Sequence, residues 1–341
     1  MLQKIKKSKY PAISAEEEAV SIPLQTLCQA IFDAILVHIV NTVSAGGKWQ
    51  QLQQQMCDAL NRRKDEHTIG ILSRTYYDAD VLFIQEAASM FMATAGKTAL
   101  GAQYHIAASS SLDGKRDQNS IILLRRDYFD LNTLQEHTSE VMAALQSVEG
   151  GKPVPVANGD VFVISVHDIF GRPYLLASFH GDTNGLATKP VLAAVDAAAR
   201  ARPGHTLLFG LDANTYEVGD NIKYQQVLDF AAAYGAAGYT SCWGDVPDPK
   251  NHTTYNARTF LQAQLQKAAR VDELAKKGDK NPKDFVLFPK GVFAVAATTK
   301  DNTGERRYVE GMVFPTLAFP SDHGVLATTL KDSRPPVKKL R

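Results

Sequence analysis

The sequence predicts an α+β protein, a four-layered α/β sandwich in which two mainly antiparallel β-sheets pack face to face with helices outside. Short apolar and β-branched runs, of the length of buried strands, alternate with helix-like segments along nearly the whole chain. No internal repeat or low-complexity linker interrupts them, and 341 residues with 45% hydrophobic side chains can form one large core. The main strand runs begin at Ile35, Val81, Ile121, Leu175, Leu207, Phe285 and Val325.

The N-terminal part is predicted to be a mobile arm that leads into a helix and then a strand. Residues 1–15 carry lysines but no apolar core, and residues 15–33 are helix-like with an acidic start that suits the positive end of a helix dipole. The β-branched run from Ile35 to Val40 ends at Asn41, so it predicts a buried strand. The expected layout is an arm at 1–15, a domain at 16–330 with an insertion at about 247–280, and a basic tail at 331–341.

The remaining elements follow from the same patterns. Further strands are expected at 80–86, 104–108, 120–124, 161–164, 174–179, 206–210, 285–288 and 292–295, and helices at 49–62, 190–201, 224–233 and 258–277. The turn Gly171-Arg172-Pro173 separates two strand runs, which predicts a hairpin. Pro190 fits the first turn of its helix.

Composition restricts the function classes. The net charge of +1 gives no overall field toward nucleic acid or a membrane, although a local basic groove stays open. Three scattered cysteines predict free thiols in a reducing compartment and no zinc site. The apolar run over residues 22–43 contains Asp33, His38 and glutamines, so we expect no membrane span. We expect an intracellular protein, cytoplasmic or nuclear, with organellar import left open by the lysine-rich start.

Polar residues gather where the expected strands end. These residues are Asn41, Glu86, His180, Asp212, Asn214, Asp284, Asp322 and His323. Strand ends on a rigid sheet are where catalytic groups can be held in fixed geometry. Glu86, Asn41 and Asp322 offer the oxygen ligands that Mg²⁺ takes while it keeps several waters. An aspartate beside His323 would favour its charged imidazolium.

The order of these motifs resembles the endonuclease/exonuclease/phosphatase superfamily, which has the DNase I-like fold. The motifs are Val40-Asn41-Thr42, Ile84-Gln85-Glu86, Ser178-Phe179-His180, Gly210-Leu211-Asp212-Ala213-Asn214 and Ser321-Asp322-His323, spread over residues 35–330. Asn119-Ser120-Ile121 is similar to the family's central strand, and Lys283-Asp284-Phe285 to a segment whose aspartate supports the final histidine. The chain departs from the pattern at Leu211, at Thr42-Val43 and in the insertion at about 247–280.

The resemblance implies a Mg²⁺-dependent phosphoester hydrolase, with Mn²⁺ as an alternative ion. It implies metal ligands at Asn41, Glu86 and Asp322, and catalytic roles for His180, Asp212, Asn214, Asp284 and His323. Asn119 is a candidate substrate-binding residue, and so is Arg258 at the end of a Thr253–Arg258 loop that serves equally well as a helix cap.

The substrate class stays open at this point. The family includes nucleases, RNA deadenylases, inositol-phosphate and lipid phosphatases and sphingomyelinases. Lys115, Arg116, Arg125, Arg126 and Arg258 favour nucleic acid slightly, and the oligomeric state is unknown. A catalytically silent relative that acts as a binding or assembly module is the alternative from another class. Intact Glu86, Asp212 and His323 favour an enzyme.

Overall fold

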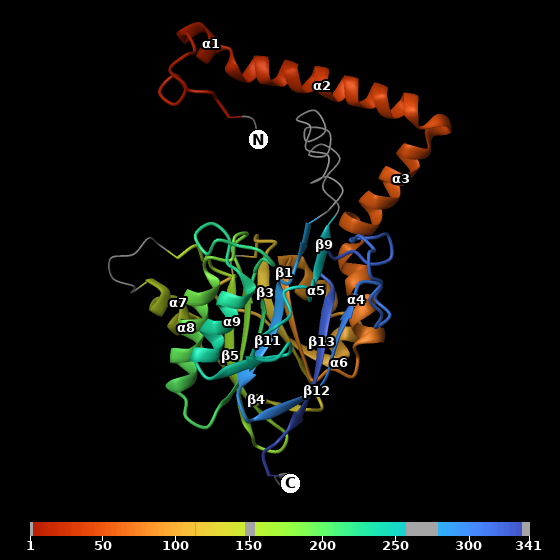
Figure 1. Ribbon diagram of the computed structural model, residues 1–341. Coiled ribbons are helices and arrows are strands. Elements are labelled where there is room, and N and C mark those ends of the chain that lie inside the picture. The colour runs from red at the N-terminus through yellow and green to blue at the C-terminus, as the bar shows by residue number, and fades with distance from the viewer. Residues whose placement is uncertain (1–2, 113, 147–153, 257–278, 336–341) are drawn as a thin grey trace. The chain divides into compact units, whose positions relative to one another are not determined.

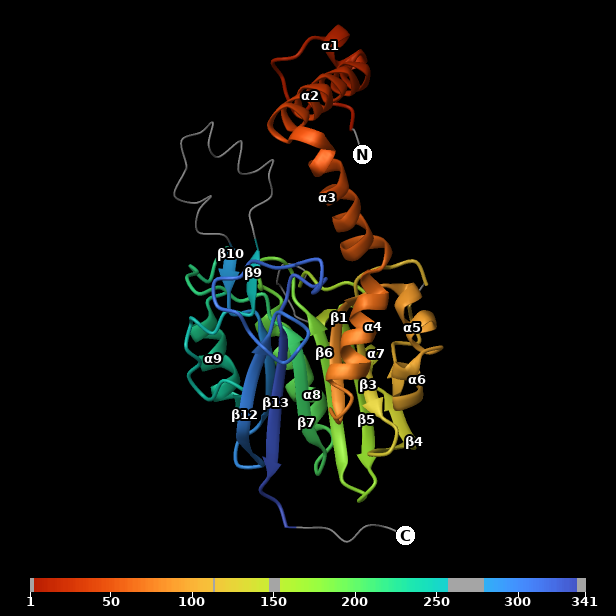
Figure 2. The same cartoon turned by 90° about the vertical axis from the view of Figure 1, so that its right-hand side faces the viewer.

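The computed structural model describes residues 3–112, 114–146, 154–256 and 279–335, and it divides into two units, Met1–Asn61 and Arg62–Arg341 (Figures 1 and 2). This division lies far from the predicted domain start at residue 16. Each unit is described separately below.

The first unit is helical. It contains α1 (Ala15–Ala19), α2 (Ser21–Val43), a short 3₁₀ turn at Ala45–Gly47 and α3 (Lys48–Cys57), followed by a π-helical turn at Asp58–Arg62. The predicted strand at Ile35–Val40 is therefore wrong, because these residues lie in α2. Asn41 belongs to the same helix, and its side-chain oxygen accepts hydrogen bonds from Trp49 Nε1 at 2.8 Å and Gln50 Nε2 at 3.0 Å.

The start of the chain is tied to this helical unit. A capping box between Ser14 and Glu17 begins α1, since each side chain binds the other's backbone amide. The Lys7 amide donates to the Glu18 carboxylate, and the Ile5 amide donates to the Ser21 hydroxyl. The described part of the predicted arm thus has specific contacts with α1 and α2.

Helix α2 is apolar and exposed. Ser21 is its only buried residue among those described, while Ile35 is 53% and Val37 44% exposed. By length and composition this helix is able to cross a membrane, unlike the expectation from its polar interruptions. An apolar helix without a covered face is unusual in water, because the hydrophobic face of a surface helix normally packs on a core.

In its described residues the second unit contains three β-sheets and a further two-stranded pair at the base of the insertion. The largest has the order β4 (Phe129–Glu136), β5 (Val161–Asp168), β6 (Pro173–His180), β7 (Thr206–Asp212), β11 (Asp284–Pro289) and β8 (Tyr239–Ser241). Its neighbours are antiparallel except β6 and β7. Opposite it lie β1 (Val81–Ala87), β3 (Asn119–Arg125) and β2 (Tyr104–Ala107), in the order β1-β3-β2, and the separate pair β12 (Phe293–Asp301) and β13 (Val325–Asp332).

Helices cover both outer faces. Helices α7 (Thr138–Gln146), α8 (Thr188–Arg200) and α9 (Val227–Ala236) pack on the six-stranded sheet, and α4 (Lys64–Thr75), α5 (Ser89–Ala95) and α6 (Ala99–Gln103) on the other side (Figure 1). One apolar cluster fills the space between the sheets, and two others lie beneath the helices. The predicted four-layered α+β sandwich is confirmed.

The insertion and the tail differ in detail from the prediction. Strands β9 (Thr254–Asn256) and β10 (Asp279–Asn281) pair antiparallel at the base of the insertion. The predicted helix at 258–277 and Arg258 lie outside the described residues. The predicted basic tail begins too early, because Lys331 and Asp332 belong to β13 and Arg334 donates to Asp332, Thr206 and Tyr174.

Candidate active site

Three adjacent strands of the large sheet end at the same edge with polar side chains. In the strand register, His180 pairs with Asp212 and Asp212 pairs with Asp284. Strands β6 and β7 end at this edge, and β11 begins there. The strand order therefore places a histidine and two carboxylates in a row.

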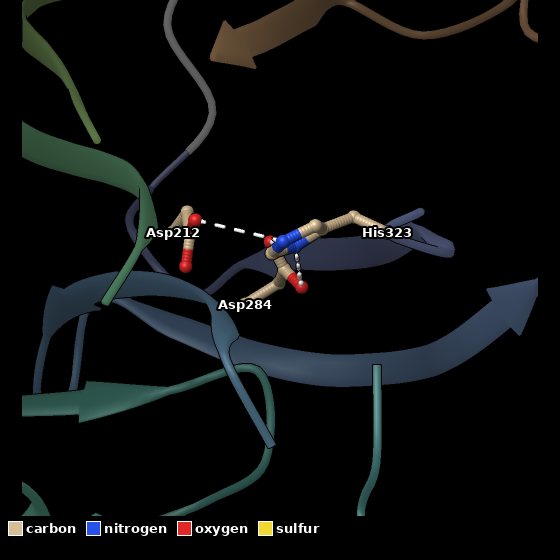
Figure 3. A group of neighbouring side chains, drawn as sticks. All are labelled: Asp212, Asp284 and His323. Atoms are coloured by element: carbon tan, nitrogen blue, oxygen red, sulfur yellow. Dashed lines mark hydrogen bonds and ion pairs between the residues drawn. The ribbon is translucent and has the colours of Figure 1, made fainter. Parts of the chain in front are cut away.

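His323 lies between the two carboxylates (Figure 3). Its Nδ1 is 2.9 Å from Asp284 Oδ2, and its Nε2 is 3.7 Å from Asp212 Oδ2. The segment that carries His323 is held against β9 by a bridge between Thr254 and His323. The contact between Asp284 and His323 that the sequence suggested is present, although 39 positions separate the two residues.

The charges of this group depend on one another. Burial by itself lowers the pKa of His323, but the negative charges of Asp284 and Asp212 outweigh it and raise that pKa to about 10. Burial also raises the pKa of Asp212, which His323 partly offsets. The imidazole ring is therefore cationic at neutral pH, and Asp212 is a stronger base than a free aspartate.

Asn214 fixes the orientation of Asp212. Its backbone amide donates to Asp212 Oδ1 at 2.9 Å, and its side-chain amide donates to Asp212 Oδ2 at 3.2 Å and to the Gly181 carbonyl at 2.8 Å. Its φ of 47° is uncommon outside glycine, although asparagine tolerates it better than most residues. Lys283 Nζ donates to Asn214 Oδ1 at 2.7 Å. Lys283 is not among the predicted site residues, and only its place directly before Asp284 in the sequence indicates it.

Glu86 approaches from the opposite sheet. The pairing of β1 with β3 is irregular between Ile84 and Ala87, and Glu86 has a φ of 55° within this bulge. Bulges often occur next to active sites, where they redirect a side chain. Glu86 Oε1 lies 3.4 Å from His180 Nε2, which is itself 3.8 Å from Asp212 Oδ2. Gln85 Nε2 donates to Ser178 Oγ at 3.0 Å and joins the two sheets at this level.

These residues open into one groove of about 850 Å³, which we call the inter-strand groove. Glu86, Asp212, Asp284, Asp322 and His323 all line it. Glu86 is 42% exposed, and its carboxylate and that of Asp322 are oxygen ligands of the kind that divalent cations such as Mg²⁺ take.

A second set of ligand atoms could also hold a metal ion. Donor atoms of Asp212, Asp284 and His323 lie within 4.8 Å of one another. A metal ion bound there would have to displace the proton of His323, because a histidine must be neutral to bind a metal ion. The two carboxylates also form ion pairs with that ring.

Two predicted site residues take other positions. The strand end that motivated Asn41 as a metal ligand is absent, because Asn41 lies in helix α2. Asn119 is 1% exposed, and its amide donates to the backbone carbonyls of Ala87 and Arg116, so it holds the backbone beside Glu86. Its substrate-binding role stays a prediction.

The comparisons with known proteins add the following. The family described as Domain of unknown function (DUF8234) matches residues 1–54. No curated protein matches the chain. Among solved structures, D. rerio TDP2 complexed with single strand DNA product has 15% identity and a TM-score of 0.50, over 81% of this chain and 95% of that one.

Two further structures score slightly lower. The endonuclease/exonuclease/phosphatase from Bacteroides vulgatus has 14% identity and a TM-score of 0.49, over 81% of this chain and 94% of its own. The endonuclease domain of TRAS1, a telomere-specific non-LTR retrotransposon, has 13% identity and a TM-score of 0.46, over 81% and 96%. At such identities a structural likeness shows the fold and not the activity. The second unit therefore has a DNase I-like fold, which it shares with the D. rerio TDP2 structure.

Proposed function

We propose that this protein is a divalent-metal-dependent phosphoester hydrolase that acts on nucleic acid. The observation that carries the proposal is His323, a histidine held cationic by Asp284 and Asp212 at the mouth of a groove that also contains Glu86 and Asp322. A fixed positive charge next to oxygen ligands is suited to bind a phosphate group and to stabilise the charge that develops on it.

The protein side chains have distinct roles in this proposal. Asp212 accepts the proton of the attacking water, because burial makes its carboxylate more basic and Asn214 fixes its direction. His323 binds a phosphate oxygen as a cation, and Asp284 positions it. His180 lies between Glu86 and Asp212 and contacts the phosphate or the leaving oxygen. Glu86 and Asp322 would hold Mg²⁺, with Mn²⁺ as the alternative, and the ion would neutralise charge on the phosphate.

One observation favours nucleic acid among phosphoesters. Lys283 adds a cation beside the cluster, with Nζ 5.7 Å from the ring centre of Tyr216, which suits any phosphoester. The similar D. rerio structure contains a single strand DNA product. Inositol phosphates and phospholipids remain the alternative substrates.

The direct test is hydrolysis of a chromogenic phosphodiester by the full chain with Mg²⁺ or with EDTA. We expect activity that requires the metal and that falls by ~10²–10⁴-fold in His323→Gln, as for a well-placed acid or base. Glu305→Gln is the matched control, because Glu305 is exposed and lies outside the groove.

The substrate is then identified with a panel of single-stranded DNA, duplex DNA, RNA, inositol phosphates and sphingomyelin. A preference for nucleic acid supports the proposal, and a preference for a lipid or an inositol phosphate reassigns the substrate. If no substrate is cleaved and EDTA changes nothing, the protein is a binding module with a silent site.

A further inference from the structure

A loop beside the candidate active site exposes large apolar side chains. Residues 216–225, which we call the 216–225 loop, lie between β7 and α9 and begin two positions after Asn214. Val218 and Ile222 are each 80% exposed, and Tyr224 is 43% exposed. Large apolar side chains that are exposed together on one short loop, next to a polar site, indicate a binding surface.

The 216–225 loop has an ordered backbone. The Asp220 carboxylate accepts hydrogen bonds from the backbone amides of residues 222, 223 and 224 at 2.7–3.2 Å. The Tyr216 amide donates to the Gln225 carbonyl at 2.9 Å, which closes the loop. The exposed side chains are therefore held on a fixed backbone, which lowers the entropy cost of binding a ligand.

The same loop is bound to the edge of the large sheet that carries the candidate active site. The Tyr216 hydroxyl donates to the Thr183 carbonyl at 2.7 Å, and the Gln225 amide donates to the Asn184 carbonyl at 2.9 Å. Both carbonyls lie three or four positions after His180, the last residue of β6. The loop therefore adjoins the place where the phosphate would bind.

Two tyrosines and a lysine connect the loop with the catalytic cluster. The ring centres of Tyr216 and Tyr224 lie 4.8 Å apart, with an angle of 52° between the ring planes. Lys283 Nζ lies 5.7 Å from the centre of the Tyr216 ring and donates to Asn214 Oδ1 at 2.7 Å. A further cation, Lys223, is exposed directly before Tyr224 in the sequence. Aromatic rings next to cations are the means by which proteins hold single-stranded nucleic acid, with bases on the rings and phosphates on the cations.

The acidic residues of the loop are engaged by other groups of the protein. Glu217 Oε2 lies 2.7 Å from His252 Nε2, and Asp220 accepts from three backbone amides. The exposed Lys223 then gives the loop a charge that complements a phosphate backbone. A lipid surface would also suit the aliphatic side chains, but it gives no role to the tyrosine pair that Lys283 joins to the cluster.

We propose that the 216–225 loop is a recognition surface for single-stranded nucleic acid, in which a base next to the bound phosphate stacks on Tyr224. The exposed aliphatic side chains contact the sugars, and Lys223 and Lys283 contact the phosphates. A base stacks on a protein ring only where its face is uncovered, which distinguishes a single strand from a duplex. The inference rests on the proposed function for the class of ligand, and it restricts that class to single strands.

Fluorescence anisotropy of a labelled oligothymidylate of about ten nucleotides with the full chain tests this proposal, with EDTA present so that binding is measured without hydrolysis. We expect Tyr224→Ala to weaken binding by about 5- to 150-fold, the range for loss of one base–aromatic contact. Tyr224→Phe should bind like the wild type, because its ring remains. Tyr77→Ala is the matched control, since Tyr77 is 59% exposed and precedes β1 at the end opposite Glu86. A duplex of the same sequence should bind more weakly than the single strand.

Photo-cross-linking gives an independent measurement. A 5-iodouracil base in the same oligonucleotide should cross-link to the peptide that contains Tyr224. Equal affinity of the wild type and Tyr224→Ala, or tighter binding of the duplex, overturns the proposal even when the chromogenic ester is hydrolysed. Binding that depends on Tyr224 without hydrolysis of any ester supports the loop assignment and contradicts only the proposed function. A wild type that binds no oligonucleotide overturns the proposal, and its sedimentation with phosphatidylcholine–phosphatidylserine vesicles would assign the loop to a membrane surface instead.

Discussion

The two sheets of the sandwich differ in how completely they are built. The large sheet is continuous over six strands, and its ends fix His180, Asp212 and Asp284 through strand register. The opposite layer is divided into β1-β3-β2 and β12-β13, and Glu86 stands on an edge strand at a bulge. One side of the candidate site is thus set by a continuous hydrogen-bonded sheet, whereas the other lies on the edge strands of a divided layer.

The residues of the site have more contacts on the large sheet than on the divided layer. The Asp212–His323–Asp284 cluster has short contacts to neighbours on several elements. Glu86 has one contact with His180 at 3.4 Å, and Asp322 contributes to the same groove. We therefore expect changes on the large sheet to affect chemistry, and changes on the divided layer to affect metal binding and stability.

The largest effect is expected from Asp212→Asn. Loss of the base should lower the turnover of a phosphodiester by ~10²–10⁴-fold. Because the pKa of Asp212 is raised, its ionised form disfavours folding, so this part of the stability is present at low pH and is lost as pH rises through its folded pKa. The melting temperature at neutral pH should therefore stay equal or increase. A fall in both activity and melting temperature would indicate a structural role instead.

The next effect concerns the divided layer. Glu86→Gln removes the exposed carboxylate of the proposed magnesium site but keeps its shape, and we expect metal affinity to fall by about 10-fold or more, on the scale known for changes at metal sites. Isothermal titration calorimetry with Mg²⁺ and Mn²⁺ measures it. If Glu86→Gln binds Mg²⁺ and Mn²⁺ as tightly as the wild type, the metal site is reassigned to Asp212 and Asp284.

Apolar runs predicted all five strands of the divided layer but only four of the six strands of the large sheet, because β4 and β8 were not expected. The pairing of Asp284 with His323 was implied by the family resemblance. Buried strands have a strong local signal because their composition reflects burial on both faces. The same signal at Ile35–Val40 gave a wrong element, since intrinsic preference is a weak prior that does not fix the conformation of a segment.

Other features of the site could not be predicted from local patterns in the sequence. Lys283 enters the site only because β11 begins beside β7, and the bulge at Glu86 depends on pairing with Asn119. The burial of Asn119 follows from packing against Gly159 and Ala87, which are distant in the sequence. Such relations are set by tertiary contacts and not by local pattern.

The contact between the two sheets can be tested at Gly210 of β7. A Cβ atom there would lie 2.2 Å from Phe83 Cγ of β1, so Gly210→Ala forces the sheets apart and should cost about 1–3 kcal/mol of unfolding free energy. Gly235→Ala in α9 is the matched control. Its Cβ meets nothing within 4 Å, and the change should stabilise the protein by about 0.4–1 kcal/mol. Both changes in unfolding free energy are measured by urea unfolding. If Gly210→Ala and Gly235→Ala change it by the same amount, β1 moves freely against β7.

The smallest effect at neutral pH is expected from Asp284→Asn, which removes one charge from the rigid cluster and keeps the side-chain shape. Asp284 and Asp212 together raise the pKa of His323 to about 10 against the opposing effect of burial. With Asp212 still present, loss of the nearer carboxylate should lower that pKa by about one to three units. His323 then loses its proton at lower pH, so the alkaline limb of the pH–rate profile moves to lower pH while activity near pH 6 changes little.

The stability of the fold should depend on the same proton. Because folding raises the pKa of His323, protonation of this ring stabilises the folded state fully below the ordinary pKa of 6.5. This stabilisation is lost as pH rises toward 10. The wild type should therefore lose more melting temperature between pH 6 and pH 10 than Asp284→Asn does. Both profiles are measured on one substrate and one buffer series. An unchanged alkaline limb together with equal pH dependence of melting would show that Asp212 alone keeps His323 charged, so that only one of the two carboxylates on the large sheet is needed for this purpose.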